Sequence, residues 1–171
     1  MPLTPAPTLT TERLTLRGPE KSDFPAFCAF VTGSPRMEHL GGAVTEGDAW
    51  RGFIGGIGHW HWHGYGFFTL LSRSGDAPVG RVGVLNHVDW PEPELAWHMF
   101  DGAEGKGLAY EAALAVRDWA CRALGLGPLV SLIAPANQRS GQLAARLGAQ
   151  VERTHPHGDE VVNLWRHPVP A

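Results

Sequence analysis

The chain has 171 residues, 43% of them hydrophobic and 18% charged, a balance typical of one globular domain. The formal net charge is -3 and there is no long basic run, which argues against a surface for nucleic acid. No stretch approaches the about 20 apolar residues of a membrane span, and the first residues lack the pattern of a signal peptide. Cys28 and Cys121 lie in unrelated segments, as is typical of reduced, buried thiols, so we expect a cytoplasmic protein.

The N-terminal third predicts an arm, a strand and two helices. Residues 1–9 are rich in Pro and Thr and are expected to form a flexible arm, followed by one domain over residues 10–168. Leucines alternate with polar residues over 13–18, which predicts a strand. Apolar residues at helical spacing predict a helix over 24–31 and another over roughly 45–60, although glycines weaken the second pattern.

The middle of the chain predicts three strands. FFTLLSR (67–73) and VGRVGVLNH (79–87) flank the segment SGDAP, whose residues are typical of a turn, so the two runs predict a hairpin. PEPELAWHMF (91–100) predicts a third strand, which opens with two prolines.

The last third predicts two helices and three strands. Residues 108–124 carry the clearest helical stripe, 128–134 resemble a short buried strand, and 137–147 predict a second helix that ends at a glycine. Residues 149–154 and 160–165 predict antiparallel strands around a turn at HPHGD. Hairpins mixed with helix crossovers in this order predict one mixed sheet covered by helices, an α/β domain.

The segment EGKGLAYEA (104–112) places two glycines directly before residues that favour a helix. The first N–H groups of a helix have no partner within it, and glycine lets a ligand approach the backbone, so this loop is suited to a phosphate. The same glycines could simply shape a turn, and the local sequence leaves both interpretations open. A P-loop is excluded, because no Gly-Lys-Ser/Thr follows the glycines.

Five short motifs follow one another along the chain: ERLTLRG, PVGRVGV, ELAWHM, EGKGLAYEAA, and Asn-x-x-Ser followed by ARLGA. Together they resemble the GNAT N-acetyltransferases, in the branch that includes ribosomal-protein N-terminal acetyltransferases, over about residues 10–166. The resemblance implies a GNAT-like single domain with a central, mostly antiparallel sheet of about seven strands flanked by about four helices. It also implies acetyl-CoA as cosubstrate, with no metal, and an amine acceptor.

The resemblance makes the glycine loop the binding site for the pyrophosphate of coenzyme A. The loop residues so implied are Glu104, Gly105, Lys106, Gly107, Leu108 and Ala109. Relatives usually have Gln or Arg where this chain has Glu104, and a carboxylate beside a pyrophosphate lowers the expected affinity. The backbone N–H groups and the helix N-terminus still supply the binding.

The strand over 91–100 offers candidates for the chemistry. Glu94 and His98 share one face of it, with Cα atoms about 13 Å apart. The resemblance places Trp97, His98 and Met99 along the pantetheine arm and favours Glu94 as the general base, with His98 as the second candidate because of its ordinary pKa near 6.5. A solvated carboxylate and a hydrogen-bonded sheet histidine are the structural alternatives.

Asn137 and Ser140 form the last part of the expected site. Asn137 is a good helix N-cap, and an Asn at this position in the family also contacts the coenzyme A arm. Many relatives carry a Tyr seven residues later as the acid for the thiolate, but this chain has Ala144 there. In the branch that the chain resembles, Ser140 takes that role; its structural alternative is to cap the first turn of its own helix.

HWHWHGY (59–65) is the other conspicuous stretch. His59, His61 and His63 have spacings that suit zinc, but no acidic or Cys partner is near in the sequence, so we expect surface histidines and no metal. We expect Trp60 and Trp62 to pack, and the resemblance places this segment beside the acceptor groove.

The leading hypothesis is an acetyl-CoA-dependent N-acetyltransferase that transfers the acetyl group directly to a primary amine of a protein N-terminus or small molecule. The alternative is a non-catalytic acyl-CoA-binding module of the same fold, which the departures at Glu104 and Ala144 favour. The expected partners are acetyl-CoA and the amine, with no nucleic acid and no membrane; a homodimer is possible because relatives often form one.

Overall fold

A mixed sheet of eight strands forms the centre of the molecule, and the computed structural model describes residues 3–171. In spatial order the strands are β1 (Leu9–Thr10), β2 (Leu14–Arg17), β3 (Phe67–Ser72), β4 (Pro78–Leu85), β5 (Glu94–Met99), β6 (Val130–Ile133), β8 (Glu160–Arg166) and β7 (Gln150–His157). Every pair of neighbours is antiparallel except β5 and β6. The predicted α/β fold is confirmed, and β1 is an additional short strand.

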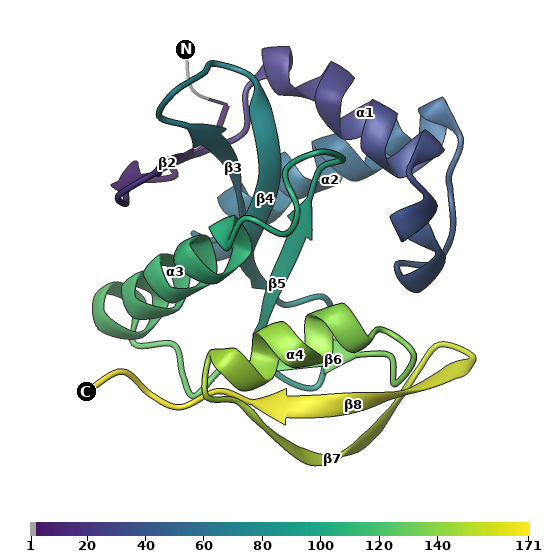
Figure 1. Cartoon of the computed structure of the whole chain (residues 1–171), viewed down its shortest axis with the longest axis vertical. Helices are drawn as coiled ribbons and strands as arrows, with labels where there is room; N and C mark the ends of the chain where they lie inside the picture. Colours follow the sequence, from purple (N-terminus) through teal and green to yellow (C-terminus); the bar gives the residue numbers. More distant parts are fainter. Residues whose placement is uncertain (1–2) are drawn as a thin grey trace.

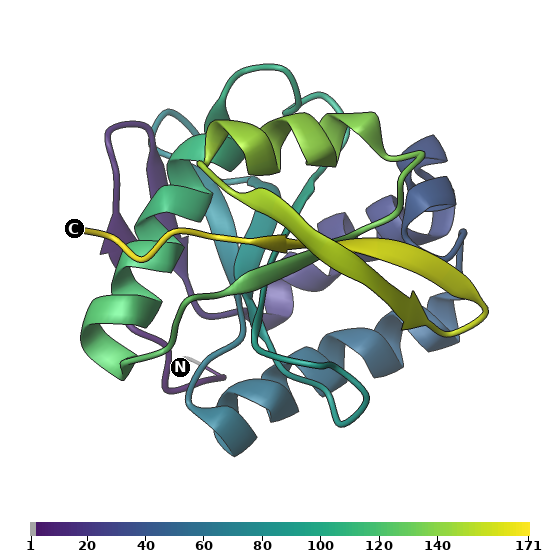
Figure 2. The ribbon, with the colours of Figure 1, turned by 90° about the horizontal axis from the view of Figure 1, so that it is seen from below.

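Helices α1 and α2 cover one face of the sheet, and α3 and α4 cover the other (Figure 1; Figure 2). The helices are α1 (Phe24–Gly33), α2 (Glu46–His63), α3 (Leu108–Leu124) and α4 (Gln138–Arg146), with short 3-10 turns η1 (Lys21–Asp23) and η2 (Pro35–His39). Helix α2 forms despite its glycines, because Thr45 caps its first turn through the N–H of Asp48 at 3.1 Å and because Trp60 is fully buried.

The main core lies between the sheet and α3. Leu70, Val82 and Leu95 of the sheet pack against Ala113 and Val116 of α3, and all five side chains are fully buried. The small alanines on this face let α3 lie close to the strands. A second cluster of phenylalanines from α1 and α2 covers the opposite face of the sheet. The two clusters fix both faces of β4 and β5, which carry the site residues.

Several local predictions differ from the structure. Cys28 and Cys121 are free thiols, as expected, but both are partly exposed rather than buried. The predicted turn at HPHGD begins later, because His157 pairs with Glu160 and the first three residues of the segment belong to β7. Within the predicted arm, Thr4 is buried and Leu9 begins β1.

The sheet opens between β5 and β6. These parallel strands pair at one position, Glu94 with Val130, whereas β5 pairs with β4 along its whole length and β6 pairs with β8. Figure 1 shows β5 running away from β6 beyond this point. The divergence leaves one edge of β5 free of a strand partner in the described chain, and the candidate site lies there.

Candidate active site

Two cavities meet at this opening of the sheet. One, about 900 Å³, lies against α2, the β4–β5 loop and β5, and we name it the histidine cavity after the imidazoles that line it. The other, about 740 Å³, lies between η2, β5, the loop over 103–107 and α4, and we name it the loop cavity. Six residues line both cavities: His39, Leu40, Trp97, His98, Asn137 and Ser140. The two cavities therefore adjoin each other at these six residues.

The loop of the loop cavity has the backbone that the glycines predicted. Gly105 and Gly107 have φ angles of 73° and 76°, in the left-handed region that favours glycine, and Gly107 is the N-cap of α3. Leu108 and Ala109 follow as the first residues of the helix, and they line the cavity with both glycines. Their N–H groups have no partner within the helix, so this end of the cavity favours an anion.

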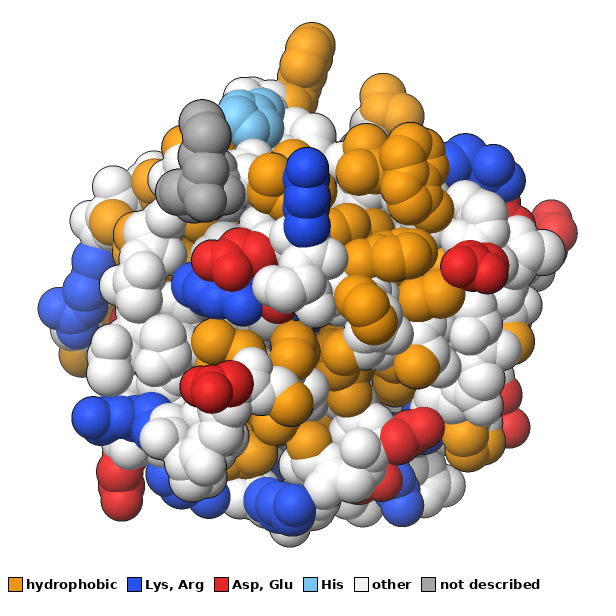
Figure 3. All heavy atoms as spheres, turned by 90° about the horizontal axis from the view of Figure 1, so that it is seen from above, with side chains coloured by type: hydrophobic (Ala, Val, Ile, Leu, Met, Phe, Trp, Pro, Cys, Tyr) orange, Lys and Arg blue, Asp and Glu red, His pale blue; other side chains and the backbone are white. Residues whose placement is uncertain are grey.

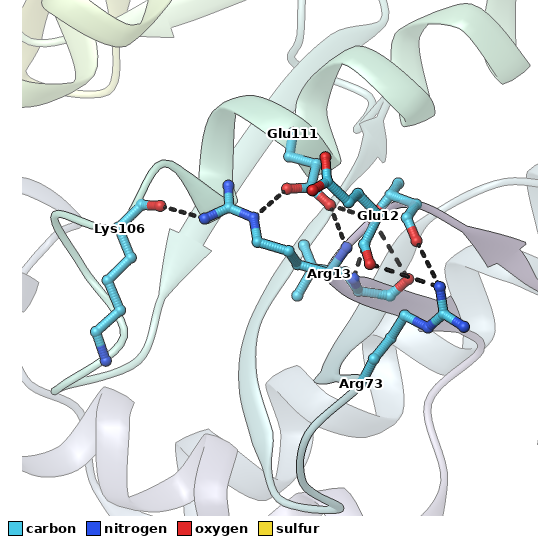
Figure 4. Close-up of polar contacts among 7 residues, drawn as sticks. Glu12, Arg13, Arg73, Lys106 and Glu111 are labelled. Atoms are coloured by element: carbon cyan, nitrogen blue, oxygen red, sulfur yellow. Dashed lines mark hydrogen bonds and ion pairs between the residues drawn. The ribbon is translucent and has the colours of Figure 1, made fainter.

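Arg13 of the β1–β2 turn holds this loop from behind (Figure 4). Its Nη1 donates to the carbonyl oxygen of Lys106 at 2.8 Å, and its Nε donates to Glu111 of α3 at 2.7 Å. The Lys106–Gly107 peptide is trans, so its C=O and N–H point in opposite directions. Since Arg13 holds the carbonyl oxygen on its own side, the N–H of Gly107 points away from that side.

Glu104 does not leave an uncompensated negative charge in the loop cavity. The hydrogen bond from its own backbone N–H, assisted by the guanidinium of Arg36, holds the pKa of Glu104 below its ordinary value, and Arg36 Nη1 lies 3.6 Å from Glu104 Oε2. Arg139 and Arg146 also line the cavity, against one further carboxylate, Glu38. The arginines thus outnumber the acids, which suits a polyanionic ligand.

Lys106 differs from its neighbours in the loop. Its Nζ donates to the carbonyl oxygen of Gly102 at 2.8 Å, and it lines a hollow beside Arg13 instead of the loop cavity. Trp97, His98 and Met99 of β5 line the loop cavity, so the predicted coenzyme residues come together there except for Lys106.

Glu94 lies at the point where β5 and β6 separate. The structural alternative, a carboxylate exposed to solvent, does not hold for it. The residue is only 8% exposed, lines the histidine cavity, and accepts hydrogen bonds from the indole Nε1 of Trp90 at 2.6 Å and the backbone N–H of Leu132 at 2.9 Å. Burial raises the pKa of Glu94 from 4.5 to about 7, against the opposing effect of the two hydrogen bonds. Near neutral pH this carboxyl group therefore exchanges a proton readily.

His98 has a fixed protonation state. Its Nδ1 accepts a hydrogen bond from Arg81 Nε at 2.8 Å, so the neutral ring carries its proton on Nε2. Burial, together with the guanidinium groups of Arg81 and Arg36, holds the pKa of His98 well below its usual 6.5. The ring faces both cavities as an N–H donor. This geometry argues against His98 as the general base.

Asn137 and Ser140 meet Trp97 at the boundary between the cavities. Asn137 is the N-cap of α4 and accepts the backbone N–H of Ser140 at 3.2 Å, as its capping alternative predicted. The Ser140 hydroxyl oxygen accepts the indole N–H of Trp97 at 3.3 Å, which leaves the hydroxyl hydrogen available to a ligand. Ser140 therefore has a structural contact and a free donor at once.

Comparisons with known proteins identify the family. A family model described as an acetyltransferase (GNAT) domain matches residues 13–150. The chain belongs to the GNAT acetyltransferases. A crystal structure of an acetyltransferase from Agrobacterium tumefaciens str. C58 is 37% identical, covers 95% of this chain and 94% of that one, and superposes with a TM-score of 0.88.

More distant GNAT relatives agree with this. The uncharacterized N-acetyltransferase YnaD of Bacillus subtilis (strain 168) is 24% identical over 157 residues, 89% of this chain and 90% of its own. RimL, a ribosomal L7/L12 α-N-protein acetyltransferase solved in complex with coenzyme A, is 16% identical, covers 93% of this chain and 96% of its own, and has a TM-score of 0.77. At that identity RimL shows the shared fold alone.

In the histidine-rich segment over 59–65, the structure differs from the expected surface histidines and packed tryptophans. His59 is buried, not at the surface: its Nδ1 donates to the carbonyl oxygen of Tyr65 at 2.8 Å and its Nε2 accepts the N–H of Asn86 at 3.0 Å. Trp60 packs in the core, but Trp62 is 85% exposed, so the prediction for Trp62 is wrong. Among residues 3–171, no group of three or more His, Cys, Asp or Glu side chains is placed to hold a metal ion.

Three residues of the GNAT site escaped the sequence analysis. Arg81 fixes His98, Trp90 binds Glu94, and Arg13 positions the loop. Arg81 carried a signal, because it is a lone charge inside the apolar run PVGRVGV. Arg13 carried none, since its partners Lys106 and Glu111 lie more than 90 residues away in the chain. Trp90 is only four residues from Glu94, but the bend that brings the indole back onto the carboxylate leaves no periodic pattern in the sequence.

The surface of the GNAT domain agrees with the modest net charge. On the face drawn in Figure 3, acidic and basic side chains of the described residues are interspersed rather than gathered by sign. None of the helices within residues 3–171 has the length and apolar character needed to cross a membrane.

Proposed function

We propose that this GNAT acetyltransferase transfers the acetyl group of acetyl-CoA directly to a primary amine of a protein N-terminus or small molecule. The observation that carries the proposal is the meeting of two cavities at six shared residues, beside the opening between β5 and β6. An amine in the histidine cavity and a thioester in the loop cavity can approach each other there. Direct attack then needs no covalent intermediate on the protein.

The loop cavity fits coenzyme A on its own chemistry. Gly107 adopts the left-handed backbone that opens α3 beside the cavity, and the unpaired N–H groups of the first turn supply donors for a phosphate. Arg139 and Arg146 add positive charge, and Arg36 offsets Glu104. Trp97 and Met99 provide apolar walls toward the boundary residues, as a pantetheine arm requires. Acetyl-CoA supplies the activated acyl group.

Glu94 is the proposed general base. The attacking amine must lose a proton as its N–C bond forms and the C–S bond breaks, and a carboxyl group with a pKa of about 7 can accept it directly or through water. Its hydrogen bonds from Trp90 and Leu132 hold both oxygens in place. The sulfur leaves as a thiolate, to which the Ser140 hydroxyl donates a hydrogen bond. His98, a fixed N–H donor, binds an oxygen at the same boundary.

The experiment is a measurement of coenzyme A release with purified protein, acetyl-CoA and a panel of peptides and small amines. The proposal expects amine-dependent release that falls strongly in Glu94→Gln, while binding of acetyl-CoA by calorimetry stays within about threefold. Arg51→Gln, an exposed site on α2, is the matched control and should behave as wild type. Binding of acetyl-CoA without release for any amine would instead support the non-catalytic module.

A further inference from the structure

Arg81 stands apart from the other groups of the histidine cavity. It is the only Lys or Arg among the described residues that line this cavity, and it projects from β4 on the face that carries Glu94 and His98. Its guanidinium lies between the rings of Phe27 and Phe67, 4.5 Å and 4.2 Å from their centroids. The two rings and the hydrogen bond to His98 hold the plane of the guanidinium in one orientation.

No carboxylate of the protein balances this charge. Among residues 3–171, Arg81 forms no ion pair with Asp or Glu, and its one side-chain hydrogen bond goes to a neutral imidazole. Asp23, which lies near the same part of the core, is already paired with Arg17 at 2.8 Å and with Thr69 at 2.8 Å. Burial lowers the pKa of Arg81 to about 9, so the side chain stays charged at neutral pH.

A buried cation without an acid is costly unless a ligand completes it. Two other arginines of this chain bind a carboxylate at close range, Arg17 to Asp23 and Arg166 to Glu92, and the buried Arg117 donates to the carbonyl oxygen of Leu147. Arg81 keeps donors that no described carboxylate uses, in the cavity that receives the acceptor. The pattern is that of a site for an anionic group on the acceptor itself.

The position of Arg81 limits how far this anionic group lies from the reacting amine. Arg81 Nε is 2.8 Å from Nδ1 of His98, and His98 is one of the six residues that line both cavities. The guanidinium therefore lies directly beside the boundary at which the proposed attack of the amine takes place. In an α-amino acid the amine and the carboxylate are attached to one carbon, which matches this short separation.

We propose that Arg81 binds the carboxylate of the acceptor, and that the acceptor is a free amino acid. The inference rests on the proposed acetyl transfer and narrows its acceptor class. A protein N-terminus lacks the α-carboxylate beside its amine, because that carboxyl group forms the first peptide bond. Phe67 and Trp90 also line the cavity, so amino acids with an aromatic side chain are suitable first probes.

The experiment compares L-phenylalanine with its carboxamide and with phenethylamine, on the wild-type protein. Calorimetry with coenzyme A present should show about 10-fold or more tighter binding of the amino acid than of either analogue, because neither analogue has a carboxylate. The value of kcat/KM for coenzyme A release should follow the same order. A wider panel of free amino acids and N-terminal peptides should show the same preference for a free α-carboxylate. Equal or better use of the amide, the amine or the peptides overturns the inference.

Variants of Arg81 complete the test. Arg81→Gln should lower the ratio of the affinity for the amino acid to the affinity for the analogues by about 10-fold or more. Arg81→Lys should retain part of this preference, because the positive charge remains. If Arg81→Gln does not fold, two measurements still test the inference. These are the comparison of Arg81→Lys with wild type and the comparison of the amino acid with its analogues on the wild-type protein. Selective binding of the amino acid without any coenzyme A release would overturn the proposed acetyl transfer and support the carboxylate site. Release of coenzyme A without any preference for a carboxylate would support the proposed acetyl transfer and overturn the carboxylate site.

Discussion

Replacing Glu94 by Gln tests the electrostatics at the centre of the site. The wild-type carboxyl accepts one hydrogen bond on each oxygen, from Trp90 and from Leu132. A Gln side chain can accept only one of them and turns its NH2 toward the other donor. This mismatch costs about 1–3 kcal/mol of unfolding free energy at every pH.

The wild-type protein also loses unfolding free energy at this residue, but only as the pH rises and Glu94 ionises. The pKa of Glu94 is about 7 in the folded protein against 4.5 in the unfolded chain, so the folded state holds the proton more tightly. The stability contributed by the protonated group is complete below the lower value and is lost as pH rises through the higher one. Between about pH 5 and about pH 8.5 this loss amounts to about 2–3 kcal/mol. The Gln variant does not titrate and loses nothing from this source.

Urea unfolding of both proteins at several pH values measures the difference. Glu94→Gln should be the less stable protein near pH 5 and should equal or exceed wild type near pH 8.5. The same titration should appear in kcat/KM as a limb with an apparent pKa of about 7 that the variant lacks. A stability difference that stays constant across this range would refute the raised pKa, and a retained limb would exclude Glu94 as the base.

Three further predictions concern the loop cavity and the boundary. Gly107→Val should abolish binding of coenzyme A with the far-UV circular dichroism intact, because a side chain is strained at its φ of 76° and its Cβ would lie 3.4 Å from Nη2 of Arg13, which holds the loop; Gly102→Val, at a φ of 86° with open space around its Cβ and outside the cavity, should still bind. Arg13→Ala should raise the Kd for coenzyme A about 10-fold by releasing the Lys106 carbonyl, whereas Arg73→Ala, in the same cluster, should not. Ser140→Ala should lower kcat about 3- to 10-fold with little change in KM, and an unchanged kcat would remove it from the reaction.

The sequence predicted those parts of the site that depend on local chemistry. The glycine loop and the start of α3 follow from backbone preferences that neighbouring residues decide, and so does the capping role of Asn137. The shared face of Glu94 and His98 follows from the alternation of a strand. These features need no knowledge of what packs against them.

The parts that were missed depend on contacts between distant segments. His59 was expected at the surface because no acidic or Cys partner lies near it in the sequence, but Tyr65 and Asn86 supply both of its hydrogen bonds and allow it to be buried. The pKa of Glu94 depends on its burial where β5 and β6 separate, and the role of Arg81 depends on register with His98 across β4 and β5. Pattern analysis of one strand at a time does not reach such pairings.

The two candidates for the base differ because of the charges around each of them. His98 lies between Arg81 and Arg36, one from each cavity, so a protonated imidazole there would meet two cations. Glu94 lies on the same strand face with neutral donors as its hydrogen-bond partners, and burial keeps its proton exchangeable near neutral pH. Burial, reinforced by these two cations, thus holds the histidine neutral. In the proposed reaction the proton of the amine therefore goes to the carboxyl group of Glu94.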